Sequence, residues 1–230
     1  MKCSLETIWS EEYKRKGIPS SFRTDPTQPL VEFMTWCQER GLAGGSAADI
    51  GSGQGRNSFY LASRGFSVIA FDLLQENADV INSEAKKREF PIQAYAHDAS
   101  TKWPIQNNSL DVAVDIFCYK HIVQKEAQKT YRSELWRALK PGGYYFVSLA
   151  SENDGFYGPL LASSPDISQK LIIDPHSQIP SFLYSLDELI LEFSDLLSVV
   201  EADEKYSTSP MYGREYPRSV LNCIFQKSLG

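Results

Sequence analysis

The sequence predicts an α/β fold, a doubly wound, Rossmann-like three-layer sandwich built on a mostly parallel sheet. Two observations predict it. Apolar, strand-like runs alternate with helix-periodic segments between Ala47 and Ala150, and the first of these runs leads into a glycine-rich turn. Strands that alternate with helices pair in parallel and place the helices on both faces of the sheet. The length of 230 residues fits one domain over 1–230.

Two helices are expected ahead of the first strand, within residues 1–45. Apolar residues recur at helical spacing from Leu5 to Lys16, and a second periodic segment covers Leu30 to Cys37. The stretch between them, 19–29, is rich in Ser, Thr and Pro, which is typical of a loop.

Five strands are expected in the central region. The apolar run at 110–117 scarcely alternates, as in a parallel strand buried on both faces. Helices are predicted through Ile81 to Arg88 and from about Lys125 to Leu139. The five strand candidates are 47–50, 68–72, 92–96, 110–117 and 144–150.

The region after Ala150 departs from this rhythm. Residues 151–184 hold four prolines and exceed the length of a plain loop, so they are an insertion that either covers a site as a lid or forms an ordinary surface excursion. Ser185 to Glu188 match a capping box that opens a helix. Strands are expected at 196–200 and 220–225, with a polar loop at 207–218 between them.

Charge and composition exclude several function classes. The formal net charge is −6 and no long basic run is present, so a surface that follows nucleic-acid phosphates is not expected. No apolar stretch approaches the roughly 20 residues of a membrane span, and the first residues lack the apolar core of a signal peptide. We therefore expect a cytoplasmic protein without a membrane partner.

The cysteines and histidines predict neither a disulfide framework nor a metal site. The four cysteines are widely separated and form no C-x-x-C pair, and the chain has three histidines. The cysteines are Cys3, Cys37, Cys118 and Cys223.

A glycine turn follows the first predicted strand, with glycine at positions 51, 53 and 55. Glycines at a strand-to-helix turn let the backbone approach a ligand closely, although such a turn also forms without one. Asp72 ends the second strand about 20 residues later, where an open α/β sheet offers a carboxylate to the two hydroxyls of a ribose. Arg56 replaces the third glycine that nicotinamide-dependent oxidoreductases prefer, so the spacing favours an adenosine ligand without a pyrophosphate.

The order of these motifs resembles class I S-adenosylmethionine-dependent methyltransferases. The resemblance is clear from Ala47 to Ala150 and looser afterwards. The run from Gly55 to Ala62 is most similar to tellurite-resistance-type small-molecule methyltransferases. The matching motifs are Asp49-Ile50-Gly51-Ser52-Gly53-Gln54-Gly55, Asp72, His97-Asp98-Ala99, the strand Leu110 to Asp115, and Leu139-Lys140-Pro141-Gly142-Gly143.

The family resemblance implies a seven-stranded sheet with an antiparallel last strand, 220–227, and S-adenosylmethionine bound across the carboxyl ends of the first strands. It implies that Asp72 holds the ribose, that Asp98 and Ala99 meet the adenine, and that Leu73 or Leu74 packs on the ring. Other residues would contact the methionine part: Asp49, Gly51, Ser52, Gly53, Gly55 and Asp115. An aspartate at position 115 departs from the small or polar residue usual there, which leaves open whether it meets cofactor or acceptor.

Candidates for the chemistry and for acceptor binding follow from their places in the chain. His121, just after the fourth strand, is a candidate base or pocket residue, or else a packed histidine. Arg56, Arg214 and Arg218 can bind an anionic acceptor or lie solvated at the surface. Trp9 and Tyr13 form an aromatic stripe that covers the cofactor or simply packs in the core. Tyr157, with Phe156 and His176, would face the acceptor if 151–184 is a lid.

The sequence thus predicts a methyltransferase that transfers the methyl group of S-adenosylmethionine directly to a small-molecule acceptor, with S-adenosylhomocysteine as product and no metal. Two other functions stay open: a non-catalytic S-adenosylmethionine-binding protein, and an NAD-dependent oxidoreductase, which Arg56 and the Lys140-Pro141-Gly142-Gly143 run oppose.

Overall fold

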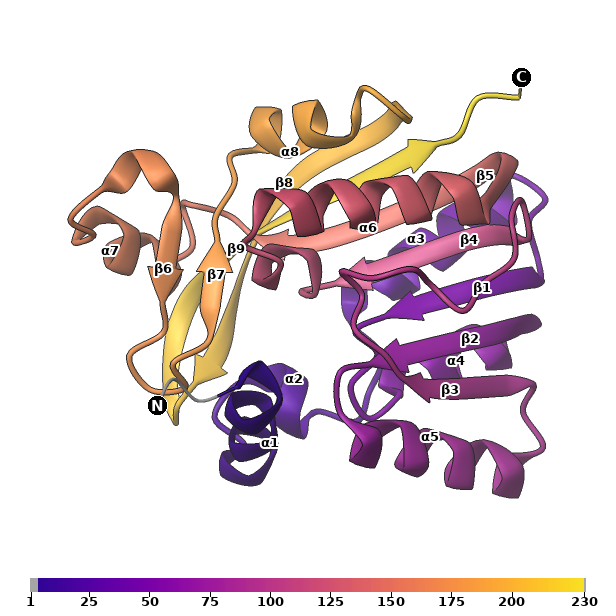
Figure 1. The fold of residues 1–230 in the computed structure, drawn as a ribbon, viewed down its shortest axis with the longest axis horizontal. Coiled ribbons are helices and arrows are strands. Elements are labelled where there is room, and N and C mark those ends of the chain that lie inside the picture. The colour runs from indigo at the N-terminus through magenta and orange to yellow at the C-terminus, as the bar shows by residue number, and fades with distance from the viewer. Residues whose placement is uncertain (1–3, 230) are drawn as a thin grey trace.

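Seven strands form one sheet in a computed structural model that describes residues 4–229 (Figure 1). The sheet order is β3-β2-β1-β4-β5-β9-β8. β9 runs antiparallel to both β5 and β8, so it is the reversed strand and the other six run the same way, as expected. The strands are β1 (Gly45–Ile50), β2 (Phe66–Asp72), β3 (Ile92–Ala96), β4 (Leu110–Ile116), β5 (Leu139–Ala150), β8 (Ser198–Met211) and β9 (Arg214–Gln226).

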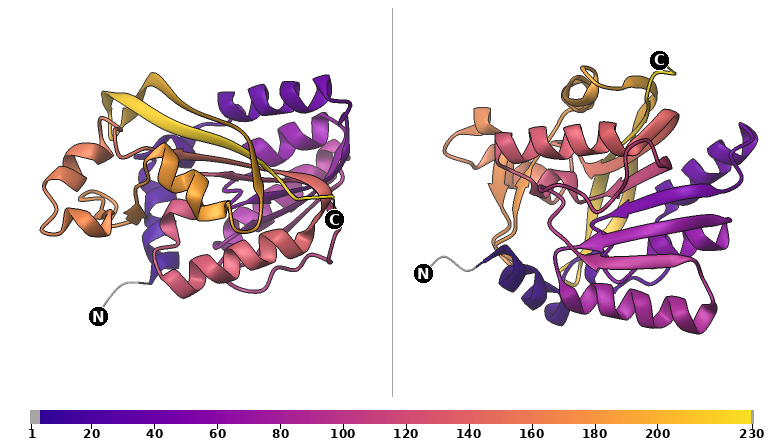
Figure 2. Two further views of the ribbon diagram at one scale, coloured as in Figure 1. Left: turned by 90° about the horizontal axis from the view of Figure 1, so that it is seen from above. Right: turned by 45° about the vertical axis from the view of Figure 1, so that its right-hand side comes forward.

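Helices cover both faces of the sheet, as Figure 2 shows from above. Because side chains alternate along a strand, neighbouring residues such as Ala47 and Ala48 enter different cores. On one face Phe33 stacks on Phe146 with ring centroids 4.7 Å apart, and on the other Tyr145 packs against Phe193 at 5.1 Å. The first face carries α3 (Gln28–Glu39), α4 (Arg56–Ser63) and α5 (Gln75–Arg88), and the second carries α6 (Lys125–Ala138) and α8 (Leu186–Phe193).

Two further helices, α1 (Leu5–Arg15) and α2 (Pro19–Phe22), lie at the carboxyl ends of the parallel strands (Figure 1). The buried Glu12 accepts hydrogen bonds from the backbone N–H groups of Gly17 and Ile18 at 2.7 and 2.9 Å, which fixes the bend between them. The expectation of a loop over 19–29 was wrong for α2, because proline is favoured in the first turn of a helix and Glu12 satisfies the N–H groups that precede it.

The predicted loop at 207–218 is also wrong, since β8 and β9 continue through it to a turn at Tyr212 and Gly213. β9 pairs with β5 only from Val220 onward, so the remainder of the hairpin is an edge of the sheet, where the carbonyls of Ser219 and Pro217 accept from the N–H groups of Ser151 and Gly155. Edge strands tolerate proline and polar side chains, and Pro210 and Pro217 sit there. The polar composition that suggested a loop is that of an exposed ribbon.

Residues 151–184 form α7 (Tyr157–Ala162), a 3-10 turn η2 (Ile167–Gln169) and a small hairpin of β6 (Leu171–Ile173) and β7 (Pro180–Phe182). β7 packs on another 3-10 turn, η1 (Tyr119–His121), directly after β4. The expected capping box at Ser185 is present and opens α8. Whether this segment acts as a lid, and whether 1–230 is one domain, stay predictions.

Within residues 4–229, no helix has the length and apolarity to cross a bilayer. The same residues hold no group of three or more His, Cys, Asp or Glu side chains placed to bind a metal ion. Cys3 lies outside the described residues.

Candidate functional site

The glycine turn between β1 and α4 places bare backbone at the carboxyl edge of the sheet. Gly51, Gly53 and Gly55 have φ of 67°, 55° and 87°, in the left-handed region that favours glycine. A Cβ at Gly51 would lie 2.6 Å from the Cβ of Cys118, and one at Gly53 would lie 2.4 Å from the hydroxyl of Tyr13. The turn thus needs glycine both for its conformation and for the groups that press on it.

Asp72, at the end of β2, anchors the turn from beside it. Its carboxylate accepts from the N–H of Gly53 at 2.9 Å, the N–H of Leu74 at 3.0 Å and the amide of Asn77 at 2.9 Å. Burial raises the pKa of the Asp72 carboxyl, and these three hydrogen bonds oppose that effect. Oδ1 accepts from both Leu74 and Asn77, whereas Oδ2 accepts from Gly53 alone and keeps acceptor capacity for a ligand hydroxyl.

Asp49, near the end of β1, is buried under α4. The hydroxyl of Ser58 donates to its carboxylate at 2.5 Å. Burial raises the pKa of Asp49 to about 6, against the opposing effects of Ser58 and of the Arg56 charge.

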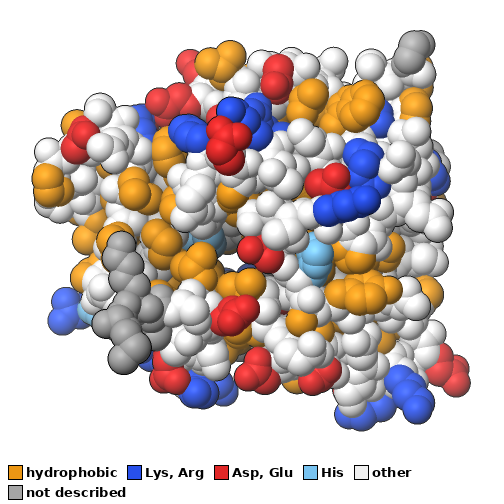
Figure 3. Space-filling model, viewed as in Figure 1, with side chains coloured by type: hydrophobic (Ala, Val, Ile, Leu, Met, Phe, Trp, Pro, Cys, Tyr) orange, Lys and Arg blue, Asp and Glu red, His pale blue; other side chains and the backbone are white. Residues whose placement is uncertain are grey.

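A cavity of about 120 Å³, which we call the α1 cavity, opens beside the turn. Figure 3 shows the surface hollowed between β7 and the carboxyl ends of the parallel strands. Trp9 and Tyr13 of α1 form one wall, with ring centroids 6.5 Å apart, and Asp72, Leu73, Asp98 and Ala99 form another. Its lining residues are Leu5, Trp9, Tyr13, Ser20, Gly51, Phe71, Asp72, Leu73, His97, Asp98, Ala99, Ile116, Phe117, Cys118, His121 and Ile122.

Asp115 lines neither this cavity nor the two larger ones described below. The alternation of β4 turns it toward α6, where its carboxylate accepts from the hydroxyl of Tyr131 at 2.7 Å and from the N–H groups of Cys118 and Tyr119 at 2.9 and 3.1 Å. Burial raises its pKa to about 7. The carboxylate therefore stabilises the turn after β4 from the side that faces α6, while Ile116 and Phe117 line the cavities.

His121 lies in the wall of the α1 cavity, edge-on to Trp9 with ring centroids 5.0 Å apart. Its Nδ1 faces the carbonyl oxygen of Pro180 at 2.8 Å, so the proton belongs on Nδ1 and Nε2 is the free acceptor. Burial, followed by the nearby charge of Lys120, lowers its pKa to about 3. A group with so low a pKa is a weak base at neutral pH, which argues against the role of general base suggested by the sequence.

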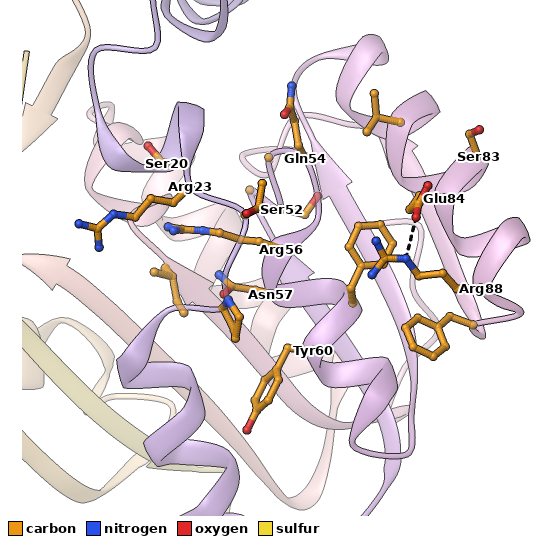
Figure 4. A pocket seen from close by; sticks show the side chains of 18 of the residues that line it. Ser20, Arg23, Ser52, Gln54, Arg56, Asn57, Tyr60, Ser83, Glu84 and Arg88 are labelled. Carbon is orange, nitrogen blue, oxygen red and sulfur yellow. Dashed lines mark hydrogen bonds and ion pairs between the residues drawn. The ribbon is translucent and has the colours of Figure 1, made fainter.

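Two larger cavities adjoin the α1 cavity. A groove of about 800 Å³ runs past the glycine turn between α4 and α5 and shares Tyr13, Ser20, Gly51 and Ile116 with the α1 cavity. Figure 4 shows side chains that line this groove.

The second, the β8–β9 cavity, measures about 680 Å³ and lies between the α2–α3 segment and the C-terminal hairpin. It shares Ile116 and Phe117 with the α1 cavity, and Arg23 and Arg56 with the groove. Ile116 lines all three spaces, so the end of β4 is their common wall.

Phe117 has a φ of 68°, which a bulky residue rarely adopts. Its N–H donates to the carbonyl of Ser148 at 2.9 Å, and the ring lines both the α1 and the β8–β9 cavities. Such backbone strain is concentrated at ligand sites, where the surrounding structure maintains it.

Three residues predicted to bind the acceptor are not free to do so. Two of them line none of these cavities, and the charge of the third is paired. Tyr157 is buried beneath Lys120, whose amine lies 3.6 Å from its ring centroid, and lines none of the three spaces. Arg214 is exposed at the start of β9 and lines none either. Arg218 lines the β8–β9 cavity but forms a buried ion pair with Asp154 at 2.7 Å.

Sequence reasoning missed Arg23, Phe117 and Cys118. Phe117 and Cys118 directly follow a predicted strand, so their place at the ligand edge of a parallel sheet was a usable signal. Arg23 belongs to the stretch expected as a loop, and no local pattern marks it.

Comparison with known proteins identifies the fold and the family. A family model for a methyltransferase domain matches residues 47–143, which span the glycine turn, Asp72, Asp98 and β4. Residues 47–143 are a class I methyltransferase domain. The methyltransferase uses S-adenosylmethionine as its cofactor.

Solved structures similar to the methyltransferase have the same fold. A SAM-dependent methyltransferase from Methanosarcina mazei superposes with a TM-score of 0.72 at 19% identity, covering 89% of this chain and 100% of that one. The 1,6-didemethyltoxoflavin-N1-methyltransferase of Burkholderia thailandensis, solved with 1,6-didemethyltoxoflavin and S-adenosylhomocysteine, gives 0.70 at 18% identity over 97% and 87%. TehB from Haemophilus influenzae gives 0.64 at 18% identity over 98% and 68%.

The site of the methyltransferase fits an adenosine cofactor. Because Gly51 and Gly53 have no side chains, Cys118 and Tyr13 of the cavity wall pack directly on the turn. Ser52 adds a buried hydroxyl without a hydrogen-bond partner at the same turn, the kind of group that a polar ligand satisfies.

Proposed function

We propose that this methyltransferase transfers a methyl group to a small-molecule acceptor by direct in-line displacement, with the acceptor in the β8–β9 cavity. The observation that carries the proposal is the wall formed by Ile116 and Phe117, which both the α1 and the β8–β9 cavities share. A volume of about 680 Å³ is in the range of small-molecule sites.

The proposed cofactor contacts follow the geometry of the α1 cavity. Asp72 accepts from the ribose hydroxyls, while Leu73, Asp98 and Ala99 surround the adenine. Gly51, Ser52, Gly53 and Gly55 provide the turn that faces the methionine part, and Asp49 supports that turn through Ser58. Trp9 and Tyr13 cover the site from α1.

Direct methyl transfer needs little general acid or base catalysis from the protein. When bound, the cofactor supplies a methyl group on a positively charged sulfur; the acceptor's lone pair forms the new bond to carbon while the carbon–sulfur electron pair returns to sulfur. The protein contributes alignment and the exclusion of water. The ring of Phe117 and the aromatic wall of α1 serve the second purpose, and no proton step is assigned to His121.

Support for a small acceptor comes from charge as well as size. The net charge of −6 disfavours a nucleic-acid substrate, whose phosphates it would repel. One structural neighbour, quoted above, was solved with bound 1,6-didemethyltoxoflavin and S-adenosylhomocysteine. A cytoplasmic location stays an expectation.

Calorimetric titration of the purified protein with S-adenosylmethionine, S-adenosylhomocysteine and NAD tests the cofactor assignment. We expect micromolar binding of the first two and none of NAD. Binding of NAD alone would overturn the assignment of the glycine turn. A small-molecule acceptor screen that measures S-adenosylhomocysteine release then tests turnover; tight cofactor binding without release for any acceptor class would favour the non-catalytic alternative.

A further inference from the structure

The β8–β9 cavity holds two arginines whose charges no carboxylate neutralises through an ion pair. Four cations line the cavity. Lys205 pairs with Glu32 at 2.5 Å and Arg218 with Asp154 at 2.7 Å. Within residues 4–229, Arg23 and Arg56 form no ion pair, and the Arg23 side chain has one hydrogen bond, to the hydroxyl of Ser209 at 3.3 Å.

Arg56 is the less solvated of the two. It is half-buried at the start of α4, and its side chain has no hydrogen bond to another described residue. Burial lowers the pKa of its guanidinium and the positive charge of Arg23 acts in the same direction, while Tyr13 and the carboxylates of Asp49 and Asp25 oppose them. In Figure 4 both side chains extend to the same side, away from Glu84 and Arg88, with Ser52 beside Arg56. The buried Ser52 hydroxyl has no hydrogen-bond partner either.

The balance of charge around the cavity is positive although the chain is acidic. Its lining includes Arg23, Arg56, Lys205 and Arg218 but only two carboxylates, Asp25 and Glu32, and Glu32 is already paired. Arg23 is exposed and Arg56 is half-buried, and two neighbouring positive charges, one of them partly removed from water, raise the free energy unless an anion lies near both. Planar oxyanions match the donor geometry of arginine.

The remainder of the cavity is apolar and large. Phe22, Ile116, Phe117 and Val220 contribute apolar surface, and about 680 Å³ far exceeds the roughly 30 Å³ share of one water molecule. An inorganic oxyanion would leave most of this space unfilled.

We propose that the methyl acceptor is a small organic anion whose carboxylate, phosphate or sulfate group is bound by Arg23 and Arg56 and whose apolar body packs on Phe117. The inference rests on the proposed function, since it names the acceptor class for the same site. Its anionic group occupies the junction between the cavity and the α4–α5 groove, and its body extends toward the wall shared with the α1 cavity.

Ligands that differ in charge or in their organic body test the proposed role of Arg23 and Arg56. We would titrate protein saturated with S-adenosylhomocysteine with 2-naphthoate, with its neutral isostere 2-naphthamide and with inorganic phosphate, by ligand-observed NMR. We expect 2-naphthoate to bind about tenfold or more tightly than the other two, and Arg23→Gln and Arg56→Gln each to weaken it by about tenfold. Arg214→Gln is the matched control and should leave its affinity unchanged, because Arg214 lies outside the cavity.

Several outcomes would overturn the proposal: no binding of 2-naphthoate to the wild type, equal affinity for acid and amide, or unchanged affinity in both cavity variants. Phosphate binding as tight as that of 2-naphthoate would overturn the claim that the acceptor has an apolar organic body. Calorimetry with S-adenosylhomocysteine separates the two proposals. Lost cofactor affinity in folded Arg56→Gln would place Arg56 on the cofactor and overturn the pair. If the wild type itself fails to bind S-adenosylhomocysteine, the proposed function fails, and the same titration of unliganded protein still tests the arginines.

Discussion

The cofactor edge of the sheet and the C-terminal part of the chain meet at the same cavities but are held together differently. At the cofactor edge the contacts are close in sequence: Asp72 bonds to Gly53, 19 positions away, and to Leu74 and Asn77 just after it. In the C-terminal part, Asp154 holds Arg218 across 64 positions.

The difference lies in what a buried polar group uses as a partner. At the cofactor edge the buried carboxylates accept mainly from backbone N–H groups and hydroxyls, which a short motif can supply. In the C-terminal part, oppositely charged side chains on separate elements form ion pairs. Each therefore depends on a residue that no local sequence pattern specifies. Changes in the two regions should therefore differ in kind: loss of ligand affinity in one, loss of stability in the other.

The largest expected effect is on stability, from Arg218→Met. It leaves Asp154 charged and buried with only backbone partners, at Ser219, Phe156 and Tyr157. We expect a loss of about 3 to 5 kcal/mol in the free energy of unfolding, measured by urea titration. The matched control, Arg214→Met at an exposed site, should change it by less than about 0.5 kcal/mol. Equal effects would remove the contrast between the two regions.

Asp72→Ala should instead act on binding. It removes the carboxylate that we propose as the acceptor for the ribose hydroxyls, and we expect about 30- to 100-fold weaker binding of S-adenosylhomocysteine by calorimetry. Asp72→Asn, which keeps one oxygen acceptor, should fall between. Unchanged affinity in a folded Asp72→Ala protein would contradict the ribose assignment.

Lys120→Met should stabilise the protein by about 1 to 3 kcal/mol at pH 6. The Lys120 amine is buried without a hydrogen-bond partner, near Tyr157, Arg218, Asp154, Asp174 and His121. Burial, followed by the Arg218 charge, lowers its pKa to about 7 from 10.5, so between these values the unfolded chain binds a proton that the folded protein does not, and stability rises with pH. The variant should lose that rise in thermal melts from pH 6 to 10; an unaltered pH profile would argue against the buried amine as its source.

Asp115→Asn should have the smallest effect at pH 7, below about 1 kcal/mol, because an amide oxygen can accept from the same two backbone N–H groups. Its signature is the pH dependence. A folded-state pKa of about 7, raised above 3.8 by burial, gives stability that is full below about pH 4 and is lost as the pH rises through 7. The variant should flatten this decline in urea titrations at pH 4 to 7, with the part due to Asp49 remaining.

The sequence predicted the cofactor edge well because its signals are local. Glycine spacing, acidic residues at strand ends and apolar runs specify β1 to β5 and the turn, and the six-plus-one strand direction was implied by the family resemblance. Asp115 lies with Ala113 on the face of β4 that α6 covers, and the prediction placed it at the end of a strand over 110–117 without assigning it to a face. A shift of one position in a strand reverses the face.

The C-terminal part could not be predicted in the same way. The ribbon of β8 and β9 beyond β5 is polar because it is an edge, and a polar segment does not by itself distinguish a strand from a loop. The exposed Arg214 and the buried Arg218 lie four residues apart in one strand, and only the distant Asp154 separates their roles. The role proposed for Arg23 likewise depends on its position beside β8, and the local sequence of residues 19–29 gives no information about that neighbour.

The attachment of α1 has a consequence for how the enzyme is made. The carbonyl of Gly17 accepts from the N–H of Tyr212 at 2.7 Å, and Arg15 donates to the carbonyl of His176. A ribosome produces α1 before β1 to β5, yet these partners emerge only after β1 to β5 can already pair. The wall formed by Trp9 and Tyr13 therefore depends on residues synthesised well after it, and a nascent chain completes the α1 cavity only once the hairpin of β8 and β9 has left the ribosome.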